Sequence, residues 1–557
     1  MDSSVNDTQL TDLCWYLLEI PERIAVETVG QRRLSCFTGR TPVYQCIMDR
    51  YGPADETHTE VYIVSSFILA LDMDWQGTKA TVFTSDLKQT GMAFEESSLL
   101  CPEPGQAVQE PDDIIGSAQR VIRRAIEESG VQAADISVVG LAGELGGFLG
   151  VDKAGKAMTP YVTAQDTRCS KYVDLMRAKD GPEIIKLSGG PAGTQGAQIL
   201  WWKHEDEHTY FDIAKFVTAY AYIGMQMCGL DAEGAFYDYT GFVDSGFGDA
   251  VYKTWSPDIL HKFHLSEDKL PKVVAPTDVI GTVCDAFAKE SGLAAGTKVV
   301  AGCVTAAAGL LGAGITKEGC IGQFTGSLSL VAGVVKDHNP DALSGDISAM
   351  RCPVGDSWYA MAFTSGSGLA ERWFKDNLTG KVEAGYAELD AEAAGVAPGA
   401  DGVFFVPKFC ARDAAKGSFV GLDWHVTRAY LYRAMLEGIA YQKRLVLDSM
   451  RSAYGSLDFS AVAAVDAAER GDLSNQIEAD VLGMTVQPLQ ADNPVGLGCA
   501  AVAAQGGGLT ADAASLIPEP AAGSAKKPDA AAQAAYEPCV RAYRDLTVLL
   551  SGFNPAR

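Results

Sequence analysis

A histidine pair with metal-ligand spacing lies in residues 204–208, which read H-E-D-E-H. On a helix, an H-E-x-x-H segment can place two zinc ligands and a general base on one face. Such a helix is buried and largely apolar, whereas acidic residues are consecutive in this segment. We therefore expect His204 and His208 to face solvent without a metal. His261 and His264 form a looser pair, which we also expect at the surface.

A serine between two glycines, Gly366-Ser367-Gly368, is the candidate for nucleophilic chemistry. A nucleophile elbow needs glycines two residues before and two residues after its serine, and this segment lacks both. Serine hydrolase chemistry is therefore not expected.

Two acidic residues, Asp72 and Asp74, follow a β-type run that reads V-Y-I-V over 61–64 and F-I-L-A-L over 67–71. A second run, residues 79–83, lies a short turn away, so we expect a hairpin that opens a domain. A helical pattern over Ile114–Ser129 and a buried strand over 136–140 come next. Strands and helices thus alternate, as an α/β domain requires.

A second α/β region runs from about Gly319 to the end of the chain. Strands are expected over 403–406 and 461–465, helices over 427–449, 474–482 and 536–550, and a surface loop over 518–532. Residues 1–66 hold two helical patterns, near 10–20 and 42–50, and form an N-terminal extension.

Length and charge limit the classes of function. The chain has 557 residues, too many for one core, so two large domains are expected. Hydrophobic residues make up 47% and charged residues 21%, which is ordinary globular composition. The net charge of -26 and the pI near 4.7 oppose attraction to phosphate backbones or anionic lipid. Nucleic acid and membrane are therefore not expected as partners.

The 13 cysteines are scattered and include no C-x-x-C, so buried reduced thiols are expected rather than a disulfide framework. The first residues lack a signal-peptide pattern, and no apolar run is long enough to span a bilayer. We expect a cytoplasmic protein.

The order and spacing of several segments resemble the FGGY carbohydrate kinases, most closely xylulokinase-like members, from about Phe67 to the end. The segments with this resemblance are residues 108–113 (VQEPDD), 140–147 (GLAGELGG), 160–168, 299–307 (VVAGCVTAA), 326–329 (GSLS), 403–407 (VFFVP), 418–422 (SFVGL), 428–444, 478–486 and 496–501. The resemblance implies two actin-like ATPase (ribonuclease H-like) domains flanking a cleft. Their expected bounds are 67–312 and 313–557, after the extension 1–66.

Phosphoryl transfer to a sugar needs a base on the acceptor hydroxyl, a metal on the phosphates and backbone amides near the transferred group. The resemblance implies that Asp72 orients magnesium. In the ungapped register, Asp74 replaces the glycine of the family's D-x-G-T turn, and Trp75 replaces its threonine. A second register would use Gly77-Thr78 as the turn, at the cost of a shorter link to the next strand.

The family's catalytic base, an aspartate, falls on Thr305. A threonine hydroxyl is far too weak a base at neutral pH, and no aspartate occurs between Asp285 and Asp337 to replace it. Asp72, Asp74 or Asp166 would have to serve as a relocated base.

The nucleotide site implied by the resemblance uses Asp74 and Thr78 on one side, and Gly326 and Ser327 in a phosphate turn. The family's adenosine turn falls on residues 466–469 (DAAE), where Ala467 and Ala468 replace glycines and two acids flank them. ATP and magnesium are therefore implied as cofactors, but acidic side chains oppose the binding of phosphate. The loop at 410–413 is also shortened relative to the family.

The sugar pocket implied by the resemblance comprises Glu144, Leu145, Gly146, Asp166 and Arg168. The first three replace the family's glutamine, methionine and histidine, so a xylulose-like acceptor cannot be assumed.

Two functions remain open. One is a pseudokinase that keeps the fold as a regulatory or structural subunit, with a protein partner engaged through residues 1–66. The other is an active kinase of an unusual sugar or polyol with a relocated base. A homo-oligomer is compatible with both.

Overall fold

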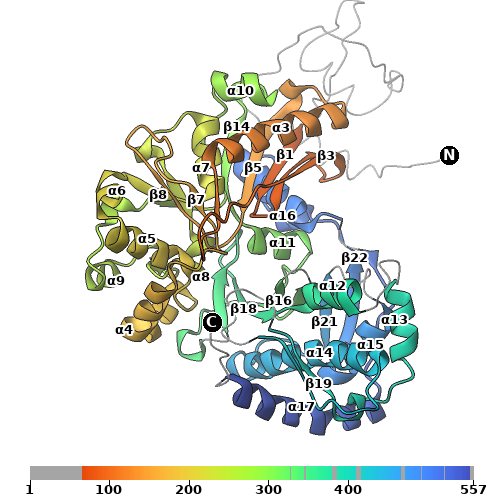
Figure 1. The fold of residues 1–557 in the computed structure, drawn as a ribbon. Coiled ribbons are helices and arrows are strands. Elements are labelled where there is room, and N and C mark those ends of the chain that lie inside the picture. Colours follow the sequence, from red (N-terminus) through yellow and green to blue (C-terminus); the bar gives the residue numbers. More distant parts are fainter. Residues whose placement is uncertain are drawn as a thin grey trace, which may run out of the picture. The chain divides into compact units, whose positions relative to one another are not determined.

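The computed structural model describes residues 66–325, 328–343, 347–378, 385–408, 416–465, 471–490, 492–519 and 521–551 (Figure 1). The predicted N-terminal extension therefore lies outside the described residues, except for Ser66. Among the described residues, no helix combines the length and apolarity that a membrane span requires.

The first sheet has six strands and opens with the predicted hairpin. Their spatial order is β13 (Val279–Thr282), β14 (Lys298–Val304), β5 (Ile136–Gly143), β1 (Phe67–Met73), β2 (Gly77–Thr84) and β3 (Gln89–Glu96). β1 runs antiparallel to β2 and parallel to β5, which in turn runs parallel to β14. The carboxyl ends of these three parallel strands therefore meet at one edge, directly after Met73, Gly143 and Val304.

Helices cover both faces of this sheet, which explains why β1 reads as a nearly continuous apolar run. One face packs against α3 (Pro111–Ser129), α7 (Ala219–Cys228) and α10 (Asp285–Ser291). The other face packs against α11 (Thr305–Gly312) and α16 (Pro494–Gly507). Successive residues of β1 alternate between these two faces.

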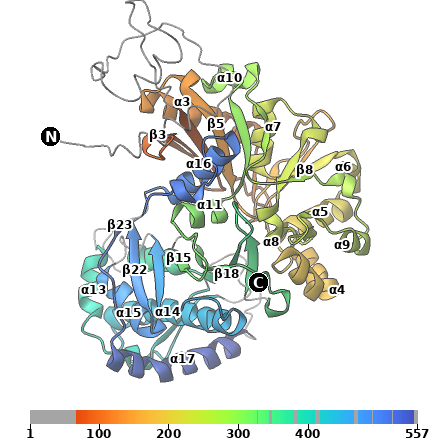
Figure 2. The same cartoon turned by 180° about the vertical axis from the view of Figure 1, so that it is seen from behind.

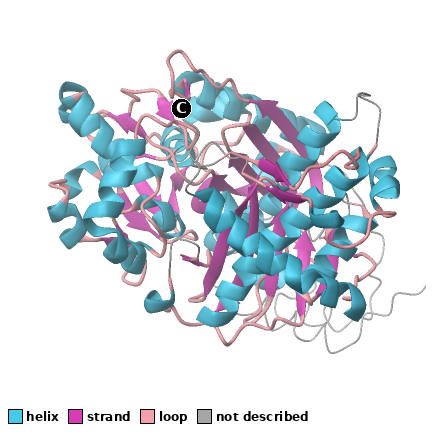
Figure 3. Ribbon diagram, turned by 60° about the horizontal axis from the view of Figure 1, so that its bottom comes forward, coloured by secondary structure: helices cyan, strands magenta, loops and turns pink. Residues whose placement is uncertain are grey.

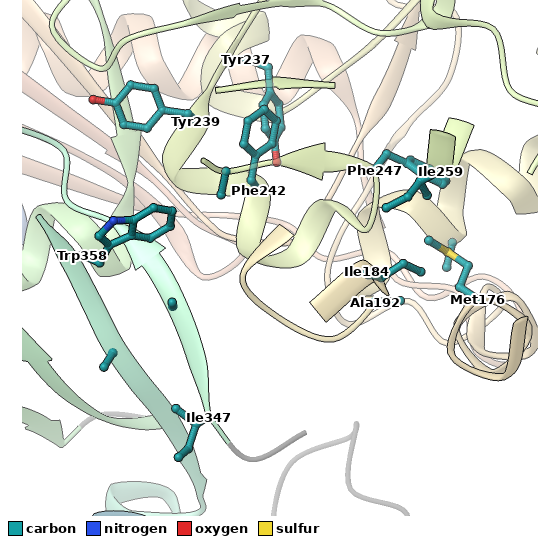
Figure 4. Close-up of a cluster of buried hydrophobic side chains, with 14 of the residues drawn as sticks. Met176, Ile184, Ala192, Tyr237, Tyr239, Phe242, Phe247, Ile259, Ile347 and Trp358 are labelled. Atoms are coloured by element: carbon teal, nitrogen blue, oxygen red, sulfur yellow. The ribbon is translucent and has the colours of Figure 1, made fainter. Parts of the chain in front are cut away.

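A helical region with short strands follows the first hairpin and precedes β13. Its helices are α4 (Ser170–Ser188), α5 (Thr194–Glu205), α6 (Glu207–Asp212), α8 (Phe242–Ser245) and α9 (Pro257–Lys262). Its strands are β4 (Val108–Gln109), β6 (Leu149–Val151), β7 (Tyr161–Val162), β8 (Lys215–Val217), β9 (Phe236–Asp238), β10 (Gly248–Asp249), β11 (Thr254–Trp255) and β12 (Lys272–Val274). An aromatic group lies at its centre, where Tyr237 stacks on Phe242 with ring centroids 5.7 Å apart (Figure 4).

The second sheet has seven strands. Their order is β17 (Ser348–Arg351), β18 (Trp358–Ser365), β16 (Leu328–Val335), β15 (Ile321–Thr325), β21 (Ala461–Val465), β22 (Thr485–Gln490) and β23 (Ala521–Ala522). The accompanying elements are α12 (Ser367–Leu378), α13 (Tyr386–Ala393), β19 (Phe404–Val406), β20 (Ser418–Val420), α14 (Arg428–Ala453), α15 (Asp472–Leu482) and α17 (Ala530–Ser551). Helices thus flank both sheets (Figure 3).

Most predicted elements are present with shifts of a few residues at their ends. The predicted surface loop over 518–532 is wrong at its end, because α17 begins at Ala530. Alanine is the residue that favours helix most, and alanines fill the first turn of this helix. The loop also contains β23, which pairs with the end of β22.

α16 belongs to the last part of the chain but packs on the first sheet (Figure 2). Gly140 of β5 permits this approach, since a Cβ there would lie 2.7 Å from Ala503 Cβ and 2.8 Å from the carbonyl oxygen of Cys499. Just before the helix, Asn493 donates a hydrogen bond to Thr81 Oγ1 at 2.9 Å. The late helix therefore closes one face of the sheet that opens the fold.

Candidate functional site

Asp72 and Thr305 meet where β1 and β14 end. Thr305 is the first residue of α11, which follows β14 directly. Its hydroxyl donates a hydrogen bond of 3.0 Å to Asp72 Oδ1, across 233 positions of sequence. The parallel sheet thus brings together the predicted metal ligand and the position at which a base was expected.

Asp72 is half-buried, and burial raises its pKa to about 6. Lys79 and the Thr305 hydroxyl oppose the rise, whereas the nearby Asp74 adds to it. Burial disfavours the charged form of a carboxyl group, and a neighbouring negative charge does the same. A substantial fraction of Asp72 is therefore protonated at pH values near 6.

Asp74 closes the turn of the β1–β2 hairpin. Its Oδ1 accepts hydrogen bonds from the backbone N–H of Gln76 at 2.7 Å and of Gly77 at 3.1 Å. Burial raises the pKa of Asp74, and these two amides oppose the rise. The carboxylate therefore already pairs with two backbone amides of the turn.

The observed turn also decides between the two registers. Gly77 and Thr78 are the first residues of β2, with Thr78 paired to Met73 and Lys79 paired to Asp72. The alternative that places Gly77-Thr78 in the turn is therefore wrong. A Cβ on Gly77 would lie 2.4 Å from the Phe94 ring, so close packing against β3 explains this glycine.

Thr78 lies on the other face of the sheet from Asp72. It pairs with Met73, whose side chain belongs to the core beneath α3 and α7. The Thr78 hydroxyl is buried and has no hydrogen-bond partner among the described residues. The structure therefore does not bring Thr78 to the Asp72–Thr305 pair.

Glu144 follows β5 at the same sheet edge. Its backbone N–H donates to the Met73 carbonyl at 3.0 Å, and its Oε1 accepts a 2.6 Å hydrogen bond from the Tyr161 hydroxyl. Burial raises the pKa of Tyr161 well above its usual range, and the charges of Glu144, Asp74 and Asp244 add to this. Tyr161 therefore stays protonated and donates its hydrogen bond to Glu144.

Gly146 and Leu145 continue this segment. The Gly146 carbonyl accepts a 2.9 Å hydrogen bond from the Thr194 hydroxyl, and Leu145 packs against the core on the α11 and α16 side. Asp244, which the sequence did not single out, accepts hydrogen bonds from the N–H groups of Thr194 at 3.2 Å and Gln195 at 3.4 Å. Asp244 is thus held at the start of α5.

Asp166 and Arg168 form a separate ion pair. Asp166 is 3% exposed, and its oxygens accept hydrogen bonds from Arg168 Nη2 at 2.7 Å, Arg168 Nε at 3.0 Å and the Ala107 amide at 3.0 Å. The Arg168 guanidinium stacks on Trp201 at 4.6 Å, beside a small pocket that Gln198 and Trp202 also line. Asp166 is therefore bonded to these neighbours rather than to Asp72 or Thr305.

A buried network behind α11 was not predicted. Asp238 is fully buried and accepts hydrogen bonds from the hydroxyls of Tyr220 and Thr240. Thr240 Oγ1 in turn accepts from the backbone N–H of Val304 at 3.1 Å, directly before Thr305. Burial raises the pKa of Asp238 to about 6. The only sequence signal is an aspartate two residues before a threonine, as in an Asx turn.

The histidine motif is divided between two helices. α5 ends at Glu205 and α6 begins at Glu207, with the Asp206 side chain capping Thr209 N at 3.1 Å. His204 and His208 are exposed, as predicted. Within the described ranges, no three histidine, cysteine or acidic side chains are grouped closely enough to hold a metal ion.

Several predicted site residues lie outside the described residues. They are Gly326, Ser327, the loop 410–413 and the adenosine turn with Ala467 and Ala468. Two fully buried hydroxyls, on Ser329 of β16 and on Ser367 at the start of α12, have no hydrogen-bond partner among the described residues. In the sequence, Ser367 stands out only as a candidate nucleophile.

Comparisons with known proteins agree with this architecture. The model of the FGGY family of carbohydrate kinases, N-terminal domain, matches residues 67–312, and the model of the C-terminal domain matches residues 325–506. Two curated relatives are a xylulose kinase from Bacillus subtilis, 24% identical over 79% of this chain and 88% of that protein, and a glycerol kinase from Nitratidesulfovibrio vulgaris, 25% identical over 79% and 90%.

Two solved structures share the fold. A xylulose kinase from Rhodospirillum rubrum has a TM-score of 0.77 and 25% identity, covering 87% of this chain and 99% of its own. A Plasmodium falciparum glycerol kinase with ADP has a TM-score of 0.73 and 16% identity, covering 88% and 99%. The fold is the two-domain, actin-like ATPase fold. The chain belongs to the FGGY family of carbohydrate kinases, whose members use ATP.

The β1–β2 side of the site fits ATP and magnesium poorly. A phosphate there would have to displace the Asp74 carboxylate from the amides of Gln76 and Gly77. It would also stand beside two carboxylates, those of Asp72 and Asp74, whose mutual repulsion already contributes to the raised pKa of Asp72. The residues at this turn therefore do not fit a magnesium-bound phosphate.

Proposed function

We propose that the chain is an FGGY-type kinase homologue in which ATP-dependent sugar phosphorylation is reduced or lost, and which serves as a regulatory or structural binding protein. The hydrogen bond between Thr305 and Asp72 carries this proposal, because the expected position of the base holds a hydroxyl that donates a hydrogen bond to a carboxylate. A threonine cannot remove a proton from a sugar hydroxyl at neutral pH.

The turn amides support the same proposal. Amides that point at a phosphate stabilise its charge only when they are free to donate. Asp74 already accepts from two of them, and its carboxylate repels an incoming phosphate. The acids at 466 and 469 are a further predicted obstacle to the nucleotide, and they lie outside the described residues.

The first test is binding of Mg-ADP and Mg-ATP to the purified protein by calorimetry. We expect binding weaker than about 1 mM, the upper end of typical Michaelis constants. We also expect no sugar-dependent ATP hydrolysis with pentuloses, hexuloses or polyols. Turnover by the unmodified protein would refute the pseudokinase proposal.

A second test separates the two defects. Asp74→Gly frees the turn amides, and we expect it to improve Mg-ADP affinity without restoring turnover. Asp86→Gly is the matched control, since it removes an exposed acid from the next turn of the same sheet. Thr305→Asp alone should leave the protein inactive. Activity in that single variant would show that the nucleotide site is intact.

An active kinase of an unusual sugar or polyol is the second candidate, and one observation favours Asp72 as its relocated base. Asp72 contacts Thr305, and a pKa of about 6 suits a general base. Asp74 and Asp166 are less suitable, because turn amides and Arg168 engage their oxygens. If turnover is found, Asp72→Asn should reduce it about 10²- to 10⁴-fold, and Thr305→Val should reduce it far less.

The remaining assignments are parts of the same proposal. Residues 67–312 and 313–557 form the two domains, and residues 1–66 form an extension that engages a protein partner. The ligand is a small sugar or polyol, held near Glu144. We place the protein in the cytoplasm, since the nine cysteines in the described part of the chain are all free thiols.

A further inference from the structure

Two half-buried cysteines lie where α7 ends and α10 begins, outside the group of residues around Asp72 and Thr305. Cys228 is the last residue of α7, and Cys284 directly precedes α10. Neither takes part in the site described above. Both are free thiols with part of their surface open to solvent.

Contacts on both sides of Cys228 lead to Cys284. The backbone N–H of Cys284 donates to the Met227 carbonyl at 2.8 Å, and the Cβ position of Gly229 lies 3.9 Å from Cys284 Sγ. A hydrogen bond to the carbonyl directly before Cys228 brings the two cysteine Cα atoms to roughly 5–7 Å. Disulfides span about the same range.

The side chain of Cys228 points toward the strand that leads to Cys284. A Cβ built on Gly281 of β13 would lie 3.0 Å from Cys228 Sγ, and Gly281 is three residues before Cys284. Cys284 Sγ in turn lies 3.8 Å from the Gln226 carbonyl oxygen. Each sulfur is thus directed at the segment that carries the other.

We propose that Cys228 and Cys284 form a redox-active thiol pair that closes to an intramolecular disulfide when it meets a small-molecule disulfide such as oxidised glutathione. One protein thiolate attacks the oxidant, forming a mixed disulfide and releasing one glutathione. The second protein thiol loses its proton and displaces the other glutathione. Two protein thiols are oxidised and one oxidised glutathione is reduced to two molecules of the thiol.

The order of attack follows from the surroundings of the two sulfurs. Burial raises the pKa of the Cys228 thiol to about 12, and Cys284 adds to this. The thiolate is the attacking species, so Cys228 is a poor first nucleophile. Cys284 therefore reacts first, and Cys228 resolves the mixed disulfide, in which the neighbouring sulfur supplies a very high local concentration.

Peptide mapping tests the pair directly in the full-length protein. After treatment with oxidised glutathione and alkylation, trypsin yields peptide 216–253, which contains only Cys228, and peptide 273–289, which contains only Cys284. We expect these two peptides to be joined by a disulfide. The exposed Cys101 and Cys320 lie in peptides 89–120 and 318–336 and should carry glutathione instead.

Variants distinguish a resolving thiol from a bystander. In Cys228→Ser, we expect Cys284 to stop at the glutathione adduct, whereas Cys101→Ser should leave the linked pair unchanged. The oxidised wild type should also unfold at a temperature several degrees higher than the reduced protein, because the cross-link restricts the unfolded chain. Peptides 216–253 and 273–289 recovered separately, either alkylated or each carrying glutathione, would overturn the proposal.

Discussion

Asp166 is a buried carboxylate and Asp72 a half-buried one, both in the first half of the chain, and their surroundings differ. Asp166 has a cation in direct contact, since Arg168 donates to both of its oxygens. Asp72 accepts a hydrogen bond from a neutral hydroxyl, and burial raises its pKa to about 6, with Lys79 opposing the rise and Asp74 adding to it. A carboxylate matched by a cation stabilises a fold. A carboxylate whose pKa burial raises despite a nearby lysine costs stability when it is ionised, and such perturbed carboxylates are typical of binding sites.

Removing Asp166 should cause the largest change in folding stability. Asp166→Ala leaves the Arg168 guanidinium without its anion and the Ala107 amide without its acceptor. Breaking a buried ion pair costs about 3 kcal/mol or more. Urea denaturation measures the loss, and an Asp166→Ala/Arg168→Ala cycle isolates the pair. A loss below about 1 kcal/mol would remove the contrast with Asp72.

Asp72→Asn should stabilise the protein, which is the opposite of the effect expected for Asp166→Ala. Because the folded-state pKa of about 6 lies above the usual 3.8, the folded protein binds this proton more tightly than the unfolded chain does. The stability that Asp72 contributes is therefore present below pH 4 and lost as pH rises through 6. The variant should gain about 1–2 kcal/mol at pH 7.5 and almost nothing at pH 4.

Thermal unfolding across this pH range measures the gain. Some pH dependence should persist in the variant, since burial also raises the pKa of Asp238 to about 6. An equal gain at pH 4 and pH 7.5 would mean that the charge of Asp72 is not the cause.

Thr305→Val should reduce folding stability by a smaller amount, and the reduction should depend on the presence of Asp72. The hydroxyl lowers the pKa of Asp72 by donating to its ionised form, so its loss should cost about 1 kcal/mol at pH 7.5 and less at pH 4. In the Asp72→Asn background the cost should shrink. A cost that is the same in both backgrounds would argue against the coupling.

His208→Ala should have the smallest effect. The side chain is 92% exposed and lies 3.6 Å from Asp212, and such surface pairs contribute about 0–1 kcal/mol. We expect unchanged stability within about 0.5 kcal/mol and unchanged zinc content. Stoichiometric zinc that disappears in this variant would restore the metal-site interpretation.

The strands and long helices could be predicted because their apolar spacing is local. The Asp72–Thr305 pair could not be found from spacing, since 233 positions separate its members, and it came only from the family resemblance. The capping role of Asp74 was missed, because a side chain's choice between solvent and its own turn amides depends on tertiary geometry. Asp238 and Asp244 look like ordinary acids until the fold buries them.

The position of α16 has a consequence for folding on the ribosome. The first sheet is complete in sequence by residue 304, yet α16, which covers one of its faces together with α11, ends only at residue 507. About two hundred residues must therefore be synthesised before α16 can pack on that apolar face. Contacts between such distant segments slow folding, and exposed apolar surface favours aggregation. A fragment that stops after α11 should precipitate unless a peptide with the sequence of α16 is supplied.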